Sequence, residues 1–347
     1  MAGRISVLMG VYNGEAYLEE TMENILEQTY SDWECIVVDD CSSDSTPEIL
    51  ARYAQKDARV RVYRNEKNMR LPATLNRALE LAQGEYILRM DADDLCRKDR
   101  FERQVAFMDA HPEFALCSCK SVMMTPDMIR LSSVQRSTQE ERVKALFLFF
   151  QPIIHPGVIA RREDMLALRY NPSISFAEDL DLWTRMIRSG RRIAMVDEHM
   201  HMYRIHGNQV SAVHSNKQRD QYREIIIPFY REMLFELSEE ELAFLEKGIY
   251  FREELDVDRF CAFIRKVFRV NRERGKFDQN AVMYAAFEVV MAYRVTFSLS
   301  AAQKLKLMSL FPPVFTVGEL LRRKQATARM RRNLAAESAL WNRELTM

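Results

Sequence analysis

The chain of 347 residues has no run of 18 apolar residues, and its first residues lead directly into a strand-like pattern instead of a signal peptide. A membrane-spanning helix needs about 20 consecutive apolar residues, so none is expected here. Without a secretory leader we expect a cytoplasmic protein, at most peripheral at the inner face of the membrane. The six cysteines form no disulfide framework and no Cys-x-x-Cys pair. This excludes a disulfide scaffold and a zinc ribbon, and it favours a reducing compartment.

A charge of one sign is also missing, because 50 lysine and arginine residues balance 50 aspartate and glutamate residues. No global field favours nucleic acid, and we expect no nucleic-acid partner. The balance is uneven along the chain. Residues 302–347 carry nine basic against three acidic residues, which leaves a net charge of −6 on the first 301 residues. A basic tail suits an anionic surface, but a solvated basic helix fits the charge equally well.

Glycine is scarce, and the two glycine-rich nucleotide loops are absent. Neither Gly-x-Gly-x-x-Gly nor Gly-x-x-x-x-Gly-Lys follows the first strand-like run, where the turn reads Gly10-Val-Tyr-Asn-Gly14. Dinucleotide-binding and P-loop chemistry are therefore excluded. The turn offers an aromatic ring and an amide instead. Carboxylates follow the later strands, so phosphate charge would be neutralised by a metal ion rather than by a helix N-terminus.

The first 110 residues alternate between strand-like and helix-like patterns. Strands are predicted over 5–9, 34–38, 59–63 and 86–90, and helices over 16–28, from 46 onward and over 72–82. This alternation predicts an α/β fold with a mostly parallel sheet and helices on both faces. Ligands bind such sheets beyond the carboxyl ends of the strands.

The remainder of the chain divides into a mixed part and a helical part. Helices are predicted around 140–150 and 179–188, and beyond 216 the chain is helical almost throughout. Breaks are expected near Pro228, Ser238, Gly275 and the Pro312-Pro313 pair. We predict a catalytic domain over residues 1–215 and a helical C-terminal region over 216–347. That region would contact an acceptor, a membrane or a second copy of the chain in a homodimer.

The stretch from Glu85 to Asp94, Glu-Tyr-Ile-Leu-Arg-Met-Asp-Ala-Asp-Asp, is the most informative of the chain. Residues i and i+2 of a strand project to the same side, so Asp91 and Asp93 would lie together. Two carboxylates that close repel each other unless one takes up a proton or finds a cation. Mg²⁺ held by one or two carboxylates commonly completes its shell with substrate phosphates. The alternative is an acidic loop that only caps the helix starting near Asp99.

Two more polar clusters follow predicted strands and would meet the acidic loop at the same edge of the sheet. One is the turn at 10–14, and the other is Asp39-Asp40-Cys-Ser-Ser-Asp44. An aspartate at the end of the second strand can accept a hydrogen bond from a base or a ribose hydroxyl. The three clusters together predict a nucleoside diphosphate held through a metal ion.

Eight ordered motifs resemble those of family 2 glycosyltransferases. They lie at Val11–Glu15, Gln28–Glu34, Val37–Thr46, Ala82–Asp94, Arg100–Gln104, Ile154–Val158, Ala177–Arg185 and Tyr203–Ser211. The resemblance covers about residues 4–212 and implies the GT-A fold, a Rossmann-like sheet flanked by helices. It also implies an inverting transferase that moves a sugar from a nucleotide-diphosphate donor, UDP by preference. The receiving group would be a hydroxyl of a saccharide or lipid-linked acceptor in surface polysaccharide or glycolipid assembly.

The resemblance assigns donor-binding roles to individual residues. The backbone around Gly10 and the ring of Tyr12 would line the nucleobase pocket, and Asp40 would contact the base. Asp91 would accept a hydrogen bond from the ribose. Arg70 departs from the family pattern, because many relatives have a glycine there. Either its guanidinium pairs with the diphosphate or the donor loop is arranged differently.

The resemblance also assigns the metal site and the catalytic base. Asp93 would bind Mn²⁺ or Mg²⁺, and His206 would add an imidazole ligand, which suits Mn²⁺ better. The alternative for His206 is a histidine that ties a loop to the core. Asp179 would take the proton of the acceptor hydroxyl. Together with Glu178 it would stand at a helix N-terminus, where the dipole favours the ionised form, and the alternative is a simple helix cap.

Two other functions are compatible with parts of the pattern. A sugar nucleotidyltransferase would carry a glycine- and arginine-rich loop near its N-terminus, which this sequence lacks. A catalytically inactive homologue could act as a saccharide-binding or scaffold subunit. Such a subunit is expected to lose some functional residues, whereas Asp40, Asp91, Asp93, Asp179 and His206 are all present.

Overall fold

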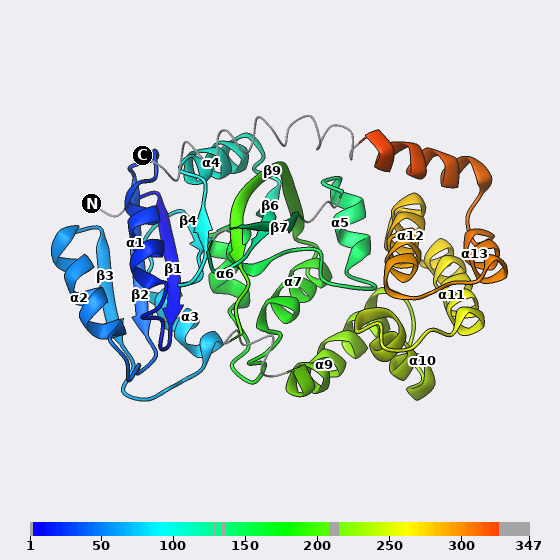
Figure 1. Cartoon of the computed structure of the whole chain (residues 1–347), viewed down its shortest axis with the longest axis horizontal. Helices are drawn as coiled ribbons and strands as arrows, with labels where there is room; N and C mark the ends of the chain where they lie inside the picture. Colours follow the sequence, from blue (N-terminus) through cyan, green and yellow to red (C-terminus); the bar gives the residue numbers. More distant parts are fainter. Residues whose placement is uncertain (1–2, 128, 134–136, 208–214, 326–347) are drawn as a thin grey trace. The chain divides into compact units, whose positions relative to one another are not determined.

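The computed structural model describes residues 3–127, 129–133, 137–207 and 215–325 (Figure 1). The chain folds into two compact units. The first unit consists of Met1–Lys144 and Gln151–Phe229, and the second consists of Ala145–Phe150 and Tyr230–Met347.

Within the described residues, nine strands of the first unit form one mixed sheet. They are β1 (Ile5–Val11), β2 (Trp33–Asp39), β3 (Val60–Arg64), β4 (Tyr86–Arg89), β5 (Leu95–Cys96), β6 (Phe114–Met124), β7 (Arg130–Ser133), β8 (Val158–Arg161) and β9 (Arg192–Arg204). Their order is β3-β2-β1-β4-β8-β6-β9-β5, and β7 pairs with β6. Strands β1 to β4 run parallel as predicted, whereas β8 runs antiparallel to both of its neighbours.

Helices cover both faces of the parallel part of the sheet. The helical elements described up to residue 233 are α1 (Leu18–Leu26), α2 (Thr46–Lys56), α3 (Leu71–Leu81), α4 (Arg100–Ala110), α5 (Glu140–Leu146), η1 (His155–Gly157), α6 (Arg162–Leu168), α7 (Glu178–Arg188) and α9 (Ser215–Met233), and some of them cover the parallel strands. On one face, buried residues of α1, α2 and α4 pack against Ile5, Val7 and Met9 of β1. Alternate residues of a strand point to opposite faces, and α3 packs on the other face of β1 and β2.

The second unit is helical. Its elements are α10 (Glu239–Phe244), the π-helical turn η2 (Leu245–Tyr250), α11 (Val257–Arg274), α12 (Gln279–Thr296) and α13 (Ala301–Met308), and residues 313–325 are also helical. Ser238 caps α10 and Gly275 ends α11 with a φ of 62°, so both of these predicted breaks are confirmed. In the ranges that the structure describes, no helix combines the length and the apolar character needed to cross a membrane. The predicted α/β fold with a helical C-terminal part is confirmed.

Pro228 lies inside α9, so the predicted break at this residue is wrong. A proline in a helix removes one hydrogen bond, and its ring crowds the carbonyl four residues earlier. Here the next two residues, Phe229 and Tyr230, are fully buried, and the Tyr230 hydroxyl donates to the Leu148 carbonyl oxygen at 2.6 Å. The burial of these two side chains offsets the energetic cost of a proline inside the helix. The sequence pattern alone does not reveal such burial.

Glu34 on β2 organises a buried polar network below the parallel strands. Its Oε1 accepts hydrogen bonds from the Ser6 hydroxyl and the Gln83 backbone N–H, each at 2.7 Å. Its Oε2 lies 2.8 Å from Nη1 of Arg61. Burial alone would raise the pKa of the Glu34 carboxyl, but these donors outweigh burial and hold that pKa below its ordinary value.

We expect Glu34→Gln to destabilise the protein by about 1–3 kcal/mol at pH 7. The substitution removes the negative charge and places the N–H groups of the amide opposite buried hydrogen-bond donors. A lowered pKa means that the carboxylate stabilises the fold above about pH 4.5 and that this stabilisation fades as the pH falls through the folded-state pKa. Urea unfolding at pH 7 and pH 4 measures the difference, with the exposed Glu66→Gln as control. If the free energy of unfolding differs between Glu34→Gln and the wild type by the same amount at both pH values, this assignment is wrong.

Candidate functional site

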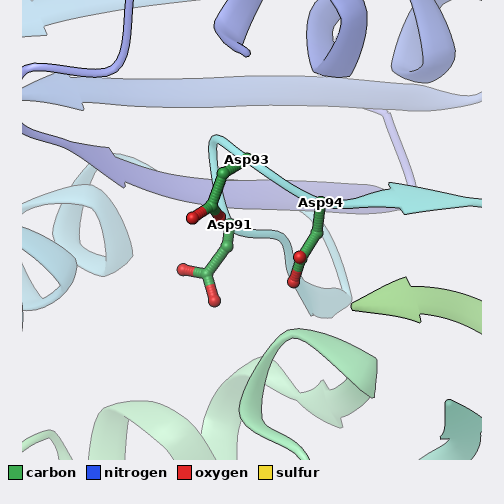
Figure 2. A group of neighbouring side chains, drawn as sticks. All are labelled: Asp91, Asp93 and Asp94. Atoms are coloured by element: carbon green, nitrogen blue, oxygen red, sulfur yellow. The ribbon is translucent and has the colours of Figure 1, made fainter. Parts of the chain in front are cut away.

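Three carboxylates meet in the loop after β4 (Figure 2). One side-chain oxygen from each of Asp91, Asp93 and Asp94 lies within 4.8 Å of the others. Strand β4 ends at Arg89, so the turn of the loop brings these oxygens together, not the alternation of a strand. In the described part of the chain no other group of three histidine, cysteine or acidic side chains is arranged in this way.

Arg89 is a buried cation beside this loop. Its guanidinium forms an ion pair with Asp91 and donates to the carbonyl oxygen of Met90. Burial would raise the pKa of Asp91, but the Arg89 charge outweighs it and holds that pKa below its ordinary value. Asp91 therefore remains a carboxylate. An arginine in an otherwise apolar strand is a signal that an acid lies nearby, because arginines are almost never buried without a partner.

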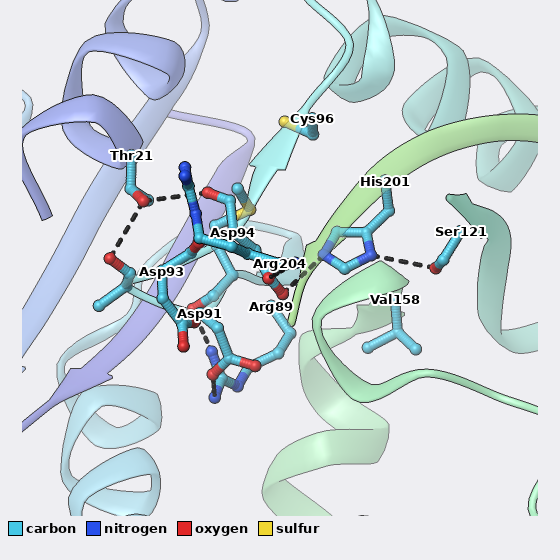
Figure 3. Close-up of polar contacts among 12 residues, drawn as sticks. Thr21, Arg89, Asp91, Asp93, Asp94, Cys96, Ser121, Val158, His201 and Arg204 are labelled. Carbon is cyan, nitrogen blue, oxygen red and sulfur yellow. Dashed lines mark hydrogen bonds and ion pairs between the residues drawn. The ribbon is translucent and has the colours of Figure 1, made fainter. Parts of the chain in front are cut away.

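Asp94 is held by β9 (Figure 3). Its Oδ1 accepts the Arg204 backbone N–H at 2.9 Å, and its Oδ2 lies 3.0 Å from Nε2 of His201. The other ring nitrogen of His201 lies 3.0 Å from the Ser121 hydroxyl oxygen. Burial lowers the pKa of His201 to about 3, so the ring is neutral and can donate to Asp94 while it accepts from Ser121. Both oxygens of Asp94 thus serve to anchor the loop.

The backbone of the acidic loop is fixed from two further sides. The Arg204 guanidinium donates from Nε to the Asp93 carbonyl oxygen at 2.8 Å and from Nη1 to the Pro126 carbonyl oxygen at 2.6 Å. From α1, the Thr21 hydroxyl lies 3.0 Å from the Asp94 carbonyl oxygen (Figure 3). Strand β9 and helix α1 therefore hold the three acids in one geometry.

His206 reaches the same loop from the segment after β9. Its Nε2 lies 2.8 Å from Oδ2 of Asp93, so the structure brings the two predicted metal ligands together. Burial raises the pKa of Asp93 to about 6, with further contributions from the charges of Asp94 and Asp91, and His206 opposes this rise. Residues 208–211 of the motif that carries His206 lie outside the described residues.

These donors fit a divalent cation. The carboxylate oxygens suit Mg²⁺ or Mn²⁺, and the imidazole of His206 adds the nitrogen ligand that Mn²⁺ accepts readily. A cation would also relieve the repulsion that raises the pKa of Asp93. Because Asp94 is held by β9, Asp93 and His206 are the side chains best placed to serve as ligands.

The turn after β1 and the turn after β2 are joined by reciprocal hydrogen bonds. The Asn13 backbone N–H donates to the Ser42 hydroxyl at 2.9 Å, and the Ser43 backbone N–H donates to Oδ1 of Asn13 at 2.9 Å. Gly10 is closely packed at the start of this turn, where a Cβ would meet Leu71 at 3.0 Å. Tyr12 takes no part in the network and is 53% exposed, so its ring is accessible to a ligand.

Asp40 holds a third loop at this edge of the sheet. Its Oδ1 accepts the Met69 backbone N–H and its Oδ2 accepts the Arg70 backbone N–H, at 2.7 and 2.9 Å. Arg70 has a φ of 70° and a ψ of 160°, a conformation that is essentially restricted to glycine. Its side chain is exposed. The carboxylate of Asp40 thus holds the strained backbone of Arg70, whose guanidinium is positively charged.

A second pair of acids stands in the first turn of α7. The helix starts at Glu178, so Asp179 lies inside it and the alternative role as N-cap is wrong. Oδ1 of Asp179 accepts the Leu180 backbone N–H at 2.8 Å, and the Gln151 side chain donates to Oδ2. Burial raises the pKa of Asp179, and the charge of Glu178 adds to this rise. Asp179 is therefore a better proton acceptor than an exposed aspartate.

Glu178 faces a buried histidine and tyrosine. Its Oε1 lies 3.6 Å from Nδ1 of His155, whose Nε2 lies 2.8 Å from the Tyr170 hydroxyl. Burial raises the pKa of Glu178 to about 7 and lowers the pKa of His155 to about 4. The positive charge of Arg89 acts on Glu178 as well as on Asp91, so the acidic loop and the first turn of α7 belong to one electrostatic environment.

Comparison with known proteins identifies the family. Residues 6–166 match the family model described as Glycosyl transferase family 2. EpsE of Bacillus subtilis (strain 168), provisionally named a glycosyltransferase, is 35% identical over 193 residues, which cover 54% of this chain and 68% of EpsE. TuaG of the same organism, provisionally named a teichuronic acid biosynthesis glycosyltransferase, is 30% identical, and the match covers 60% of this chain and 81% of TuaG. The chain belongs to glycosyltransferase family 2.

Solved structures confirm the GT-A fold of this family 2 glycosyltransferase. S. aureus TarS 1–349 in complex with UDP-GlcNAc has a TM-score of 0.58 at 20% identity, over 86% of this chain and 93% of that chain. The mannosyltransferase PcManGT from Pyrobaculum calidifontis, in complex with GDP-Man and Mn²⁺, has a TM-score of 0.51 at 20% identity. That match covers 95% of this chain and 87% of PcManGT.

The strain at Arg70 can be measured in this glycosyltransferase with two variants. Arg70→Gly removes the guanidinium and the strain, whereas Arg70→Ala removes the guanidinium but keeps the Cβ at a positive φ. We expect Arg70→Gly to be more stable than Arg70→Ala by about 1 kcal/mol, because strain of 1–3 kcal/mol is partly offset by the entropy cost of glycine. Thermal unfolding of both variants makes the comparison. Equal stability would show that the loop relaxes and that Asp40 holds no strained backbone.

Proposed function

We propose that this protein is an inverting, metal-dependent glycosyltransferase that acts in the cytoplasm. It moves a sugar from a nucleotide-diphosphate donor, UDP by preference, to a hydroxyl of a saccharide or lipid-linked acceptor in surface polysaccharide or glycolipid assembly. The observation that carries the proposal is the pairing of Asp93 with His206 beside two further carboxylates. The UDP-GlcNAc complex of TarS supports the donor, and the Mn²⁺ complex of PcManGT supports the metal.

The donor would bind at the carboxyl edge of β1, β2 and β4. Tyr12 offers an exposed ring to the base, and Asp40 offers a carboxylate at the end of β2. Asp91 would accept from the ribose, and Arg70 would place its positive charge near the diphosphate. Asp93 and His206 would hold Mn²⁺ or Mg²⁺, which supplies positive charge to the leaving diphosphate when bound.

Asp179 would act as the general base. The acceptor hydroxyl gives its proton to this carboxylate while its oxygen bonds to the anomeric carbon, and the bond from that carbon to the diphosphate breaks on the opposite face. Gln151 and the Leu180 backbone N–H fix the two oxygens of Asp179 in place. The raised pKa of Asp179 strengthens it as a proton acceptor.

Donor binding should depend on a divalent cation through Asp93. Calorimetry of UDP with and without Mn²⁺ should show tighter binding with the metal in the wild type. In Mn²⁺, the UDP affinity of Asp93→Ala should be at least about tenfold lower than that of the wild type. The exposed Asp32→Ala, at the opposite edge of the sheet, serves as the control and should bind UDP as the wild type does. Undiminished UDP affinity of Asp93→Ala in Mn²⁺ would refute the assignment.

Asp179→Asn should reduce turnover by about 10²–10⁴-fold while UDP affinity stays near that of the wild type, because the amide keeps the shape but cannot accept the proton. Release of nucleoside diphosphate from a panel of nucleotide sugars measures turnover. Asp181→Asn is the matched control, because Asp181 lies on the same helix and pairs with Arg185. Near-native turnover of Asp179→Asn would mean that another group is the base.

The dependence of turnover on pH gives a second test of the base. Activity should fall as the pH drops through the raised pKa of Asp179, since only the carboxylate accepts a proton. Because the charge of Glu178 raises that pKa, Glu178→Gln should shift the acidic limb of the pH–rate profile to lower pH. If the acidic limb of the Glu178→Gln profile is unchanged, Asp179 is not the group that accepts the proton in the rate-determining step.

A further inference from the structure

The second unit contains a cavity of about 390 Å³ between α12, α13 and the segment that joins them. Its floor is apolar and includes Val290, Leu299 and Leu307, which are at most 8% exposed. Leu305 also lines the cavity but is 74% exposed, so it lies at the mouth. The cavity is therefore open to solvent over a buried hydrocarbon floor.

Two exposed cations stand among the lining residues. They are Arg294, near the end of α12, and Lys304, in the first turns of α13. The lining contains no acidic residue, and across the described residues neither cation has an ion pair. The neighbouring Lys306, in contrast, is paired with Asp258. The mouth thus combines two uncompensated positive charges with exposed hydrocarbon.

The geometry of the mouth is fixed by a helix cap. Ser300 and Gln303 form a reciprocal capping box, with the Gln303 backbone N–H 3.2 Å from the Ser300 hydroxyl and the Ser300 backbone N–H 2.9 Å from Oε1 of Gln303. This cap sets the start of α13 at Ala301, three residues before Lys304. Lys304 and Leu305 are therefore carried on a defined helix, not on a loop.

Exposed large hydrophobic side chains are concentrated in the same unit. Five of the ten large hydrophobic side chains that are exposed in the described residues fall between positions 295 and 321. They are Val295, Leu305, Val314, Val317 and Leu321. Exposed hydrocarbon interspersed with basic residues is the chemistry of a surface that meets an anionic bilayer. Lys324 extends this composition and Arg322 is paired with Glu319, whereas Arg329, Arg331 and Arg332 lie outside the described residues.

We propose that the cavity receives a phospholipid of an anionic bilayer. The acyl chain would lie on Val290, Leu299 and Leu307, and the phosphate would lie between Arg294 and Lys304. The ligand is an amphiphile because the floor offers only hydrocarbon, and it is anionic because the mouth offers only positive charge. The proposal concerns where the enzyme works and is independent of the transfer reaction, so Asp179→Asn should bind the bilayer as the wild type does.

Flotation of the full chain with vesicles tests the proposal. Binding to vesicles of phosphatidylcholine with about one third phosphatidylglycerol should exceed binding to pure phosphatidylcholine. Arg294→Gln combined with Lys304→Gln should weaken partitioning about 25-fold, since each basic residue near an anionic surface contributes a factor of about five. Arg269→Gln combined with Arg272→Gln is the matched control, because these exposed α11 residues do not line the cavity. If both double variants lose the same amount of binding to anionic vesicles, the proposed lipid site is overturned.

A second measurement places the lipid in the cavity itself. Leu305→Trp adds a fluorophore at the mouth, and its emission should shift to shorter wavelength on anionic vesicles and be quenched by brominated phospholipid. Vesicle binding without any change in this emission would overturn the proposal. Sedimentation velocity without vesicles gives the remaining outcome. The wild type could form a dimer that the Arg294→Gln and Lys304→Gln changes dissociate. That result would assign the cavity to a second copy of the chain and overturn the lipid site.

Discussion

Repulsion among three carboxylates on one short loop is the constraint on which the site depends. Asp91, Asp93 and Asp94 have side-chain oxygens within 4.8 Å of one another, and the protein compensates each in a different way. Arg89 forms an ion pair with Asp91, β9 hydrogen-bonds both oxygens of Asp94, and the Asp93 side chain pairs with His206 in the described part of the chain. Because burial and the neighbouring charges raise the pKa of Asp93, a cation beside it would lower the energy of its ionised form.

One buried charge acts on both parts of the proposed chemistry. Arg89 is fully buried and acts on Asp91 and on Glu178, whose carboxyl stands beside Asp179. Burial is the largest cause of the raised pKa of Asp179, and the charge of Glu178 adds to it. The charge of Arg89 opposes the rise in the pKa of Glu178. The proposed proton acceptor and the proposed cation site have opposite electrostatic needs, and the charge of Arg89 acts in both places.

The sequence predicted the features that local pattern encodes. Alternation of strands and helices gave the parallel half of the sheet, and the acidic run after β4 marked the loop where Asp93 meets His206. Pattern did not reveal Arg204 or Gln151 as partners, because their contacts join residues that are distant in the chain and depend on tertiary packing. The proline inside α9 was misread for the same reason, since the burial of its neighbours is not a local property.

Asp40 shows how one carboxylate can hold a loop and still recognise a ligand. Its Oδ1 accepts from the Asn65 side chain and the Met69 backbone N–H, which uses both lone pairs of that oxygen. Its Oδ2 accepts only from the Arg70 backbone N–H among the described residues, which leaves one lone pair. A base N–H could bind there without displacing the strained loop. Binding at Oδ2 would then also depend on the conformation of Arg70, so the proposed base pocket and the guanidinium proposed to face the diphosphate would be coupled through a single oxygen.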